Sequence, residues 1–196
     1  IGSLRSVDVL LGASIQSVSE PTLGCFITSH GFGHASRSLA VLTELQALVP
    51  ALRFEVFTQT PYWFLAENLY PACFTHHDVN VDVGLVQKNP FQHDLPATLE
   101  RLKDFLPLSK STIDPLVTTL SHSSCRAIFC DISALGIAVA NAIGIPSILL
   151  ENFTWDWMYE EYLDEMPAFS DSIECIRSVY AQANLHLQTE PVCNPI

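Results

Sequence analysis

A glycine turn between an apolar run and a helical pattern most constrains how this chain can fold. Residues 23–28 form a strand-sized apolar run, and leucines recur at every third position from Leu39 to Leu48. This pattern predicts a buried strand followed by a helix. Gly31 and Gly33 lie between them, where they allow a tight turn and the close approach of a ligand. Free N–H groups at the start of the helix favour an anion such as a diphosphate.

Strand and helix patterns alternate along the rest of the chain. The clearest unit is a β-α-β pattern at 127–150. We expect strands at 53–58, 127–130, 147–150 and 185–188, and one or two short strands within 74–83. Helices are expected at 61–68, 134–143, 155–163 and 170–183. A long helical region is expected at 94–121, where Pro107 and Pro115 break or kink it. Alternation of this kind predicts an α/β, Rossmann-like three-layer sandwich with a mostly parallel sheet. We expect one domain, 21–196, after a serine-rich leader or tag, 1–20.

Composition excludes several classes of partner. The chain has 21 acidic and 9 basic residues, a net charge of −12, whereas nucleic acids and anionic membranes need a positive surface. No apolar run approaches the roughly 20 residues of a membrane-spanning helix, so no transmembrane segment is expected. The six cysteines include no C-x-x-C pair, which favours reduced thiols and a cytoplasmic protein. His76, His77 and His93 lack ligand spacing, so no metal site is expected.

Three polar residues follow predicted strands, namely His34, Asp131 and Asn152. In a parallel sheet, ligands bind beyond the carboxyl ends of the strands, so these side chains are expected at one edge. An imidazole with a pKa of ~6.5 is a suitable general base, and a carboxylate on its other nitrogen would fix the tautomer. Simpler roles remain open: His34 as a turn histidine that caps the helix, and Asp131 as a helix N-cap.

Two motifs, HGFGHASR at 30–37 and NFTWD at 152–156, resemble those of a known family. The first resembles the opening loop of GT-B glycosyltransferases, including UDP-glycosyltransferases and the lipid II-forming N-acetylglucosaminyltransferase. Together the motifs are most similar to the glycosyltransferase-like N-terminal half of L-arabinokinase and its bacterial relatives. The resemblance implies one half of a GT-B fold, the acceptor side, with His34 as the catalytic base, Asp131 as its partner, and inversion at the anomeric carbon.

The resemblance also implies binding roles for the two loops. Gly31 and Gly33 would admit a donor diphosphate, and their alternative role is a plain tight turn. In the second motif, the side chains of Asn152, Trp155 and Asp156 suit a sugar pocket. Trp155 is nevertheless expected mainly to pack on neighbouring helices, and Asp156 also suits a first helical turn. His30 is expected either to bind ligand or to bond a neighbouring loop. The candidate binding residues are His30, Gly31, Phe32, Gly33, Ser36, Arg37, Asn152, Trp155 and Asp156.

Several functions are compatible with these residues. The leading hypothesis is the acceptor-side half of a glycosyltransferase with a nucleotide sugar of the UDP-sugar type as co-substrate, no tightly bound cofactor, and a sugar or glycoside as acceptor. Such a half would need a C-terminal donor domain or a partner subunit, which is missing from this sequence. The alternative is a non-catalytic sugar or nucleotide-sugar binding module attached to another domain, such as a sugar kinase. A sugar-nucleotide epimerase is a weaker third hypothesis.

Overall fold

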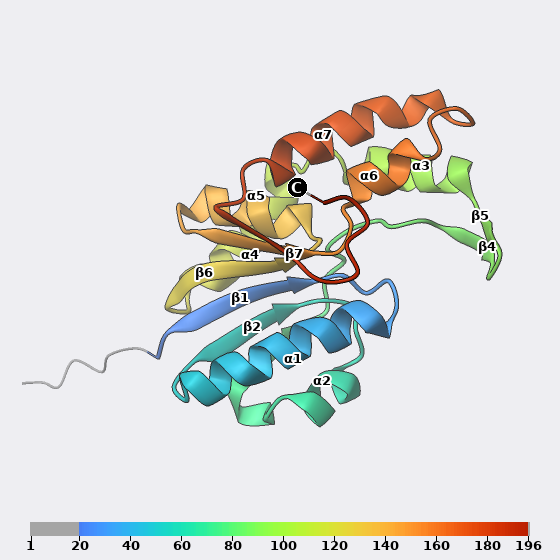
Figure 1. Cartoon of the computed structure of the whole chain (residues 1–196). Helices are drawn as coiled ribbons and strands as arrows, with labels where there is room; N and C mark the ends of the chain where they lie inside the picture. Colours follow the sequence, from blue (N-terminus) through green and yellow to red (C-terminus); the bar gives the residue numbers. More distant parts are fainter. Residues whose placement is uncertain (1–19, 196) are drawn as a thin grey trace, which may run out of the picture.

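The computed structural model describes residues 20–195, which form an α/β sandwich around a six-stranded sheet (Figure 1). Every pairing in this sheet is parallel. In spatial order the strands are β3 (Phe74–His77), β2 (Arg53–Phe57), β1 (Thr22–Ile27), β6 (Cys125–Asp131), β7 (Ser147–Glu151) and β8 (Leu185–Gln188). The direction of winding reverses between β1 and β6, which is the point where sheets of this kind bind ligands.

Helices cover both faces of the sheet, as Figure 1 shows. The first face carries α1 (Phe32–Leu48) and α2 (Tyr62–Asn68). The other face carries α3 (Leu95–Phe105), α4 (Lys110–Ser121), α5 (Ala134–Ile143), α6 (Trp155–Glu160) and α7 (Ser170–Tyr180). Short 3₁₀ turns lie at Pro71–Cys73 and Pro167–Phe169. The three-layer sandwich predicted from the sequence is therefore confirmed.

Successive residues of the central strands point into different layers, because side chains alternate along a strand. On β1, Cys25 and Ile27 belong to the cluster beneath α1, whereas Phe26 belongs to the larger cluster beneath α5. All three side chains are fully buried. Two faces packed in this way hold the carboxyl ends of β1 and β6 rigidly side by side.

The structure departs from the predicted elements in three places. Residues 74–83 supply one strand, within the one or two expected, but the chain then forms a small antiparallel hairpin of β4 (Gln87–Asn89) and β5 (Gln92–His93), which had not been expected. Pro107 separates α3 from α4, but Pro115 lies inside α4, which begins ahead of it at the Ser109 cap. The helices α6 and α7 each end three residues before the predicted position. The leader expected at 1–20 lies outside the described residues, apart from its last position.

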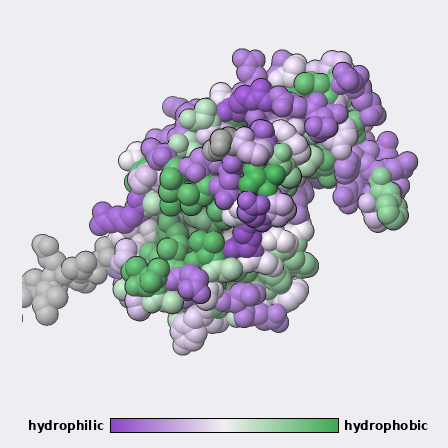
Figure 2. Space-filling view, viewed as in Figure 1, coloured by the Kyte–Doolittle hydropathy of each residue, from purple (hydrophilic) through white to green (hydrophobic). Residues whose placement is uncertain are grey.

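The surface in Figure 2 mixes polar and apolar side chains, and apolar groups gather between the α1 and α5 layers. β8 is the strand at one edge of the sheet, and its Leu185 and Leu187 are 48% and 42% exposed. Within residues 20–195, no helix combines the length and the apolar character needed to cross a membrane.

Candidate active site

The turn between β1 and α1 places its backbone in a conformation that glycine favours. Gly31, the N-cap of α1, has a φ of 84°, a region that other residues enter only with strain. A Cβ added at Gly33 would meet nothing within 4 Å, so no packing contact requires a glycine there. Phe32 is half exposed and packs on Phe64 of α2, with ring centroids 4.6 Å apart.

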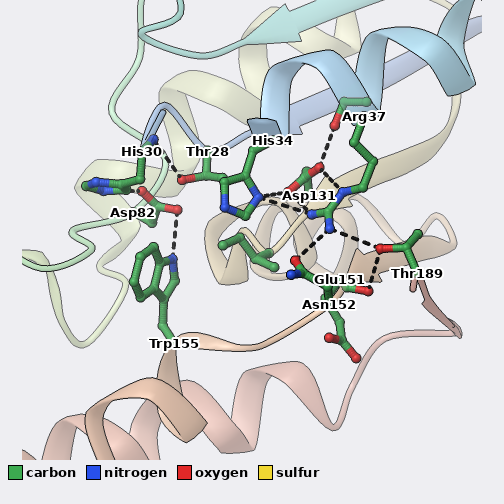
Figure 3. Close-up of polar contacts among 12 residues, drawn as sticks. Thr28, His30, His34, Arg37, Asp82, Asp131, Glu151, Asn152, Trp155 and Thr189 are labelled. Carbon is green, nitrogen blue, oxygen red and sulfur yellow. Dashed lines mark hydrogen bonds and ion pairs between the residues drawn. The ribbon is translucent and has the colours of Figure 1, made fainter. Parts of the chain in front are cut away.

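His34 and Asp131, predicted to share one edge of the sheet, are in direct contact (Figure 3). Nδ1 of His34 lies 2.9 Å from Oδ1 of Asp131. The carboxylate is 0% exposed, and the histidine side chain is 13% exposed. Neither residue caps a helix: Ser133 caps α5 by accepting a hydrogen bond from Gly136, and α1 has no side-chain cap. The geometry therefore allows an imidazole whose tautomer is set by a buried carboxylate.

Arg37 is the most connected side chain at this edge. Its Nε donates to Oδ2 of Asp131 at 3.1 Å, and its Nη2 donates to Oδ1 at 2.6 Å. Nη1 donates to Oδ1 of Asn152 at 2.7 Å and to Oγ1 of Thr189 at 3.1 Å. Nη2 also lies 3.1 Å from Nδ1 of His34. A guanidinium has five N–H donors; four of them bond Asp131, Asn152 and Thr189, and the fifth bonds His34 only when Nδ1 carries no proton.

The two neighbours of Nδ1 in His34 define two states of the ring. A carboxylate only accepts and a guanidinium only donates, so Nδ1 either donates a proton to Asp131 or accepts one from Arg37. In the first state Nε2 keeps a lone pair and can act as a base. In the second state Nε2 carries the proton and cannot. Arg37 thus takes part in deciding whether His34 is competent as a base.

Ser38 belongs to the same network, although the sequence reasoning missed it. Its Oγ donates to Oδ2 of Asp131 at 2.6 Å, and the side chain is buried. Residues three and four positions apart share a helix face, so His34, Arg37 and Ser38 all point from α1 toward β6. This spacing could have revealed the serine.

The loop after β7 approaches the same network from the other side. Asn152 accepts the hydrogen bond from Arg37, while the ring of Phe153 lies 5.6 Å from that of His34 in an edge-on arrangement. Thr189, which follows β8, bonds both Arg37 and the backbone oxygen of Glu151. The ends of β6, β7 and β8 are therefore tied to α1 through a single guanidinium.

A second histidine–carboxylate pair lies on the other side of the glycine turn. Nε2 of His30 is 3.1 Å from Oδ1 of Asp82, and Trp155 donates its indole N–H to Oδ2 at 2.9 Å. Figure 3 shows His30, Asp82 and Trp155 as a group beside His34. The tryptophan is buried and also packs edge-on against the His30 ring. The His30 ring thus lies within ion-pair distance of the carboxylate of a neighbouring loop, and Trp155 packs against both groups.

The remaining candidates are placed apart from His34. Asp156 accepts a hydrogen bond from Nε of Arg177 at 3.0 Å. It lines a separate pocket of about 250 Å³ together with His186 and Glu151. Ser36 is exposed on α1. The structure therefore does not bring Asp156 to the histidine edge.

The described cysteines and histidines supply no metal centre. Among residues 20–195, no three His, Cys, Asp or Glu side chains are grouped to hold an ion. His76 and His77 point to different partners, the Thr58 carbonyl oxygen and Glu55. All six cysteines are free thiols. Burial, and secondarily the Asp131 carboxylate, raises the pKa of Cys130, which keeps it a neutral thiol beside the site.

Known proteins share this architecture. No protein-family profile matches the chain. L-arabinokinase from Arabidopsis thaliana is 27% identical over 139 residues, covering 70% of this chain and 13% of that protein. A UGT transferase from Siraitia grosvenorii in complex with UDP superposes with a TM-score of 0.51 at 16% identity, covering 86% of this chain and 44% of that one. UGT2 from Phytolacca americana, complexed with UDP-2-fluoro-glucose and pterostilbene, superposes with a TM-score of 0.55 at 15% identity, covering 87% and 48%.

The fold is that of one half of a GT-B protein. At these identities the structural matches establish the fold, and they confirm the architecture predicted from the two motifs. The chain spans less than half the length of the two structural relatives and about an eighth of the arabinokinase.

Proposed function

We propose that this chain is the acceptor-side half of a glycosyltransferase that uses a nucleotide sugar. The observation that carries the proposal is the contact of 2.9 Å between His34 and the buried Asp131. Asp131 ends β6 and His34 lies in the first turn of α1, which follows β1, so the pair lies where the direction of winding reverses. A base at this position faces the crevice where α/β sheets of this order bind ligands.

The chemistry assigned to His34 is general base catalysis with inversion. Nε2 takes the proton of an acceptor hydroxyl while that oxygen forms a bond to the anomeric carbon. The bond from the anomeric carbon to the diphosphate breaks, and the nucleoside diphosphate leaves with the electron pair. Asp131 orients the ring through Nδ1 and stabilises the imidazolium that forms. Phe153 packs edge-on beside the ring.

The co-substrate and the partner follow from the same proposal. A UDP-sugar is the donor we propose, because the similar structures from Siraitia and Phytolacca hold UDP and a UDP-sugar. The donor would be held mainly by a second domain or subunit. The half-exposed Leu185 and Leu187 of β8 support such a partner, since contact with it would remove their apolar surface from water. The six free thiols favour the cytoplasm as the compartment.

The test is sugar transfer by the complete protein that contains this chain. His34→Gln is expected to lower kcat by about 10²–10⁴-fold while leaving KM for the donor nearly unchanged, because it removes a general base. His122→Gln, an exposed histidine at the end of α4, is the matched control. Transfer by the His34→Gln protein at the wild-type rate would refute the catalytic role.

The contact between Arg37 and His34 favours a second candidate, a non-catalytic binding module. When Arg37 donates to Nδ1, Nε2 is protonated and the histidine can only donate a hydrogen bond. The similarity to L-arabinokinase is compatible with this candidate, in which the module would serve an attached domain. Saturable binding of a UDP-sugar by the complete protein, with no release of UDP in the presence of any acceptor, would decide for it.

A further inference from the structure

A pocket lies beside His30 rather than His34. It has a volume of about 410 Å³ and lies between the glycine turn, the irregular loop 78–86 and α3. Apolar atoms come from Val83 and Phe105, and the other side chains in its wall are polar. The size suits a small ligand, and polar side chains lie beside the apolar ones in the wall.

One carboxylate oxygen in this wall has no hydrogen bond within the described residues. Oδ1 of Asp82 lies 3.1 Å from Nε2 of His30, but the direction of that contact does not meet hydrogen-bond geometry. The Asp82 side chain is only 5% exposed. A buried polar atom without a hydrogen bond is costly, so this oxygen has the capacity to accept a hydrogen bond from a ligand.

The loop that carries Asp82 is shaped around the His30 ring. Gly84 has a φ of 61°, and a Cβ there would lie 2.2 Å from the ring. Tyr159 donates a hydrogen bond to the Gly84 carbonyl oxygen at 2.9 Å, which fixes the loop from below. The histidine is therefore held in place while a third of its side chain remains exposed to the pocket.

The charges of the pocket identify the class of ligand. Asp82 and Asp104 are the carboxylates, and Arg101 is the permanent cation. An anion would meet two carboxylates, and an apolar ring would leave the polar wall without hydrogen bonds. A neutral polyhydroxylated molecule can bond both the carboxylates and the guanidinium, because each hydroxyl donates and accepts hydrogen bonds.

We propose that this pocket binds the acceptor as a free monosaccharide or the terminal sugar of a glycoside, with Asp82, His30 and Arg101 bonding its hydroxyls. This inference rests on the proposed function in calling the sugar an acceptor. Binding of the sugar to the pocket does not depend on whether the protein transfers a glycosyl group to it. If Nε2–H of His30 faces the carboxylate, Nδ1 keeps a lone pair that accepts a hydrogen bond from a sugar hydroxyl.

The test is binding of single neutral sugars, without nucleotide, by calorimetry and saturation-transfer NMR on the complete protein. D-glucose, D-xylose, L-arabinose and myo-inositol are the probes, and phenol is the apolar comparison. Arg101→Gln and His30→Gln are each expected to weaken sugar binding about tenfold or more, as loss of a charged hydrogen bond implies. Lys103→Gln changes a neighbouring exposed cation of α3 outside this pocket, and it is expected to leave binding unchanged.

His34→Gln separates the two proposals. Sugar binding that survives His34→Gln but fails in Arg101→Gln supports the pocket, whether or not the protein transfers sugar. Transfer that depends on His34 but is indifferent to Arg101→Gln and His30→Gln overturns the pocket and leaves the transferase function in place. Absence of saturable binding for every sugar, or stronger binding of phenol than of the sugars, also overturns the pocket.

Discussion

Two histidine–carboxylate pairs flank one glycine turn, and they differ in what else the carboxylate holds. Asp131 is fully buried and is bonded by His34, Arg37 and Ser38. Asp82 is bonded by the Trp155 indole and leaves Oδ1 without a hydrogen bond. The first carboxylate is saturated by the protein and serves to position a ring. The second has one oxygen without a hydrogen bond, and this difference is the basis for proposing a base at the first pair and a binding pocket at the second.

The largest expected difference between the pairs is in stability. Asp131→Asn should lower the free energy of unfolding by about 3–5 kcal/mol, because it leaves a mostly buried guanidinium without its carboxylate. Asp82→Asn should cost only about 1 kcal/mol. An amide oxygen still accepts from the Trp155 indole, and an imidazole, unlike a guanidinium, has a neutral form. Urea denaturation of both variants measures the difference, and equal losses would show that the two carboxylates play the same structural role.

The site was only partly predictable from the sequence. His34 and Asp131 follow strands of a parallel sheet, and that topology alone brings them to one edge. Ser38 could have been found from its spacing to His34. Asp82 could not, because it lies in an irregular loop whose position depends on distant contacts, such as the Tyr159 hydroxyl on the Gly84 carbonyl oxygen. No periodicity records such contacts.

The fold was predicted more completely than the site, because secondary structure depends on local sequence patterns whereas the contacts of the site depend on distant residues. The bounds of α5 and β8 agree with the sequence patterns, since apolar periodicity reports local structure directly. The hairpin of β4 and β5 escaped prediction because its residues are exposed and carry no apolar alternation. Asp156 was assigned to the site from its motif, but Arg177, more distant in the sequence, determines its contacts.

Gly84→Ala should damage the His30 pair while sparing the His34 pair. The new Cβ would overlap the His30 ring, and the positive φ costs roughly 1–2 kcal/mol for a residue other than glycine. We expect a loss of stability of about 2 kcal/mol together with loss of sugar binding. Gly33→Ala, at the start of α1 where a Cβ meets nothing, is the control and should change stability by less than about 1 kcal/mol. Thermal unfolding and the NMR signals of the two histidine rings distinguish these outcomes. A shifted His34 signal in Gly84→Ala would mean that the pairs are coupled.

A small effect at neutral pH is expected from Tyr159→Phe, which removes the hydroxyl that bonds the Gly84 carbonyl oxygen, at a cost of about 1 kcal/mol. The pH dependence makes this variant informative. Burial, and then the Asp82 carboxylate, raises the pKa of Tyr159 well above its usual value. The folded protein therefore keeps this proton above pH ~10, where the unfolded chain releases it. The free energy of unfolding contributed by this group is constant below that pH and falls above it by up to about 1.4 kcal/mol per pH unit.

Tyr159→Phe should reduce this fall of the free energy of unfolding at alkaline pH, and urea titrations between neutral and alkaline pH measure its slope. An unchanged slope would mean that Tyr159 ionises as readily in the folded protein as in the unfolded chain, and that the loop beneath His30 is open to water.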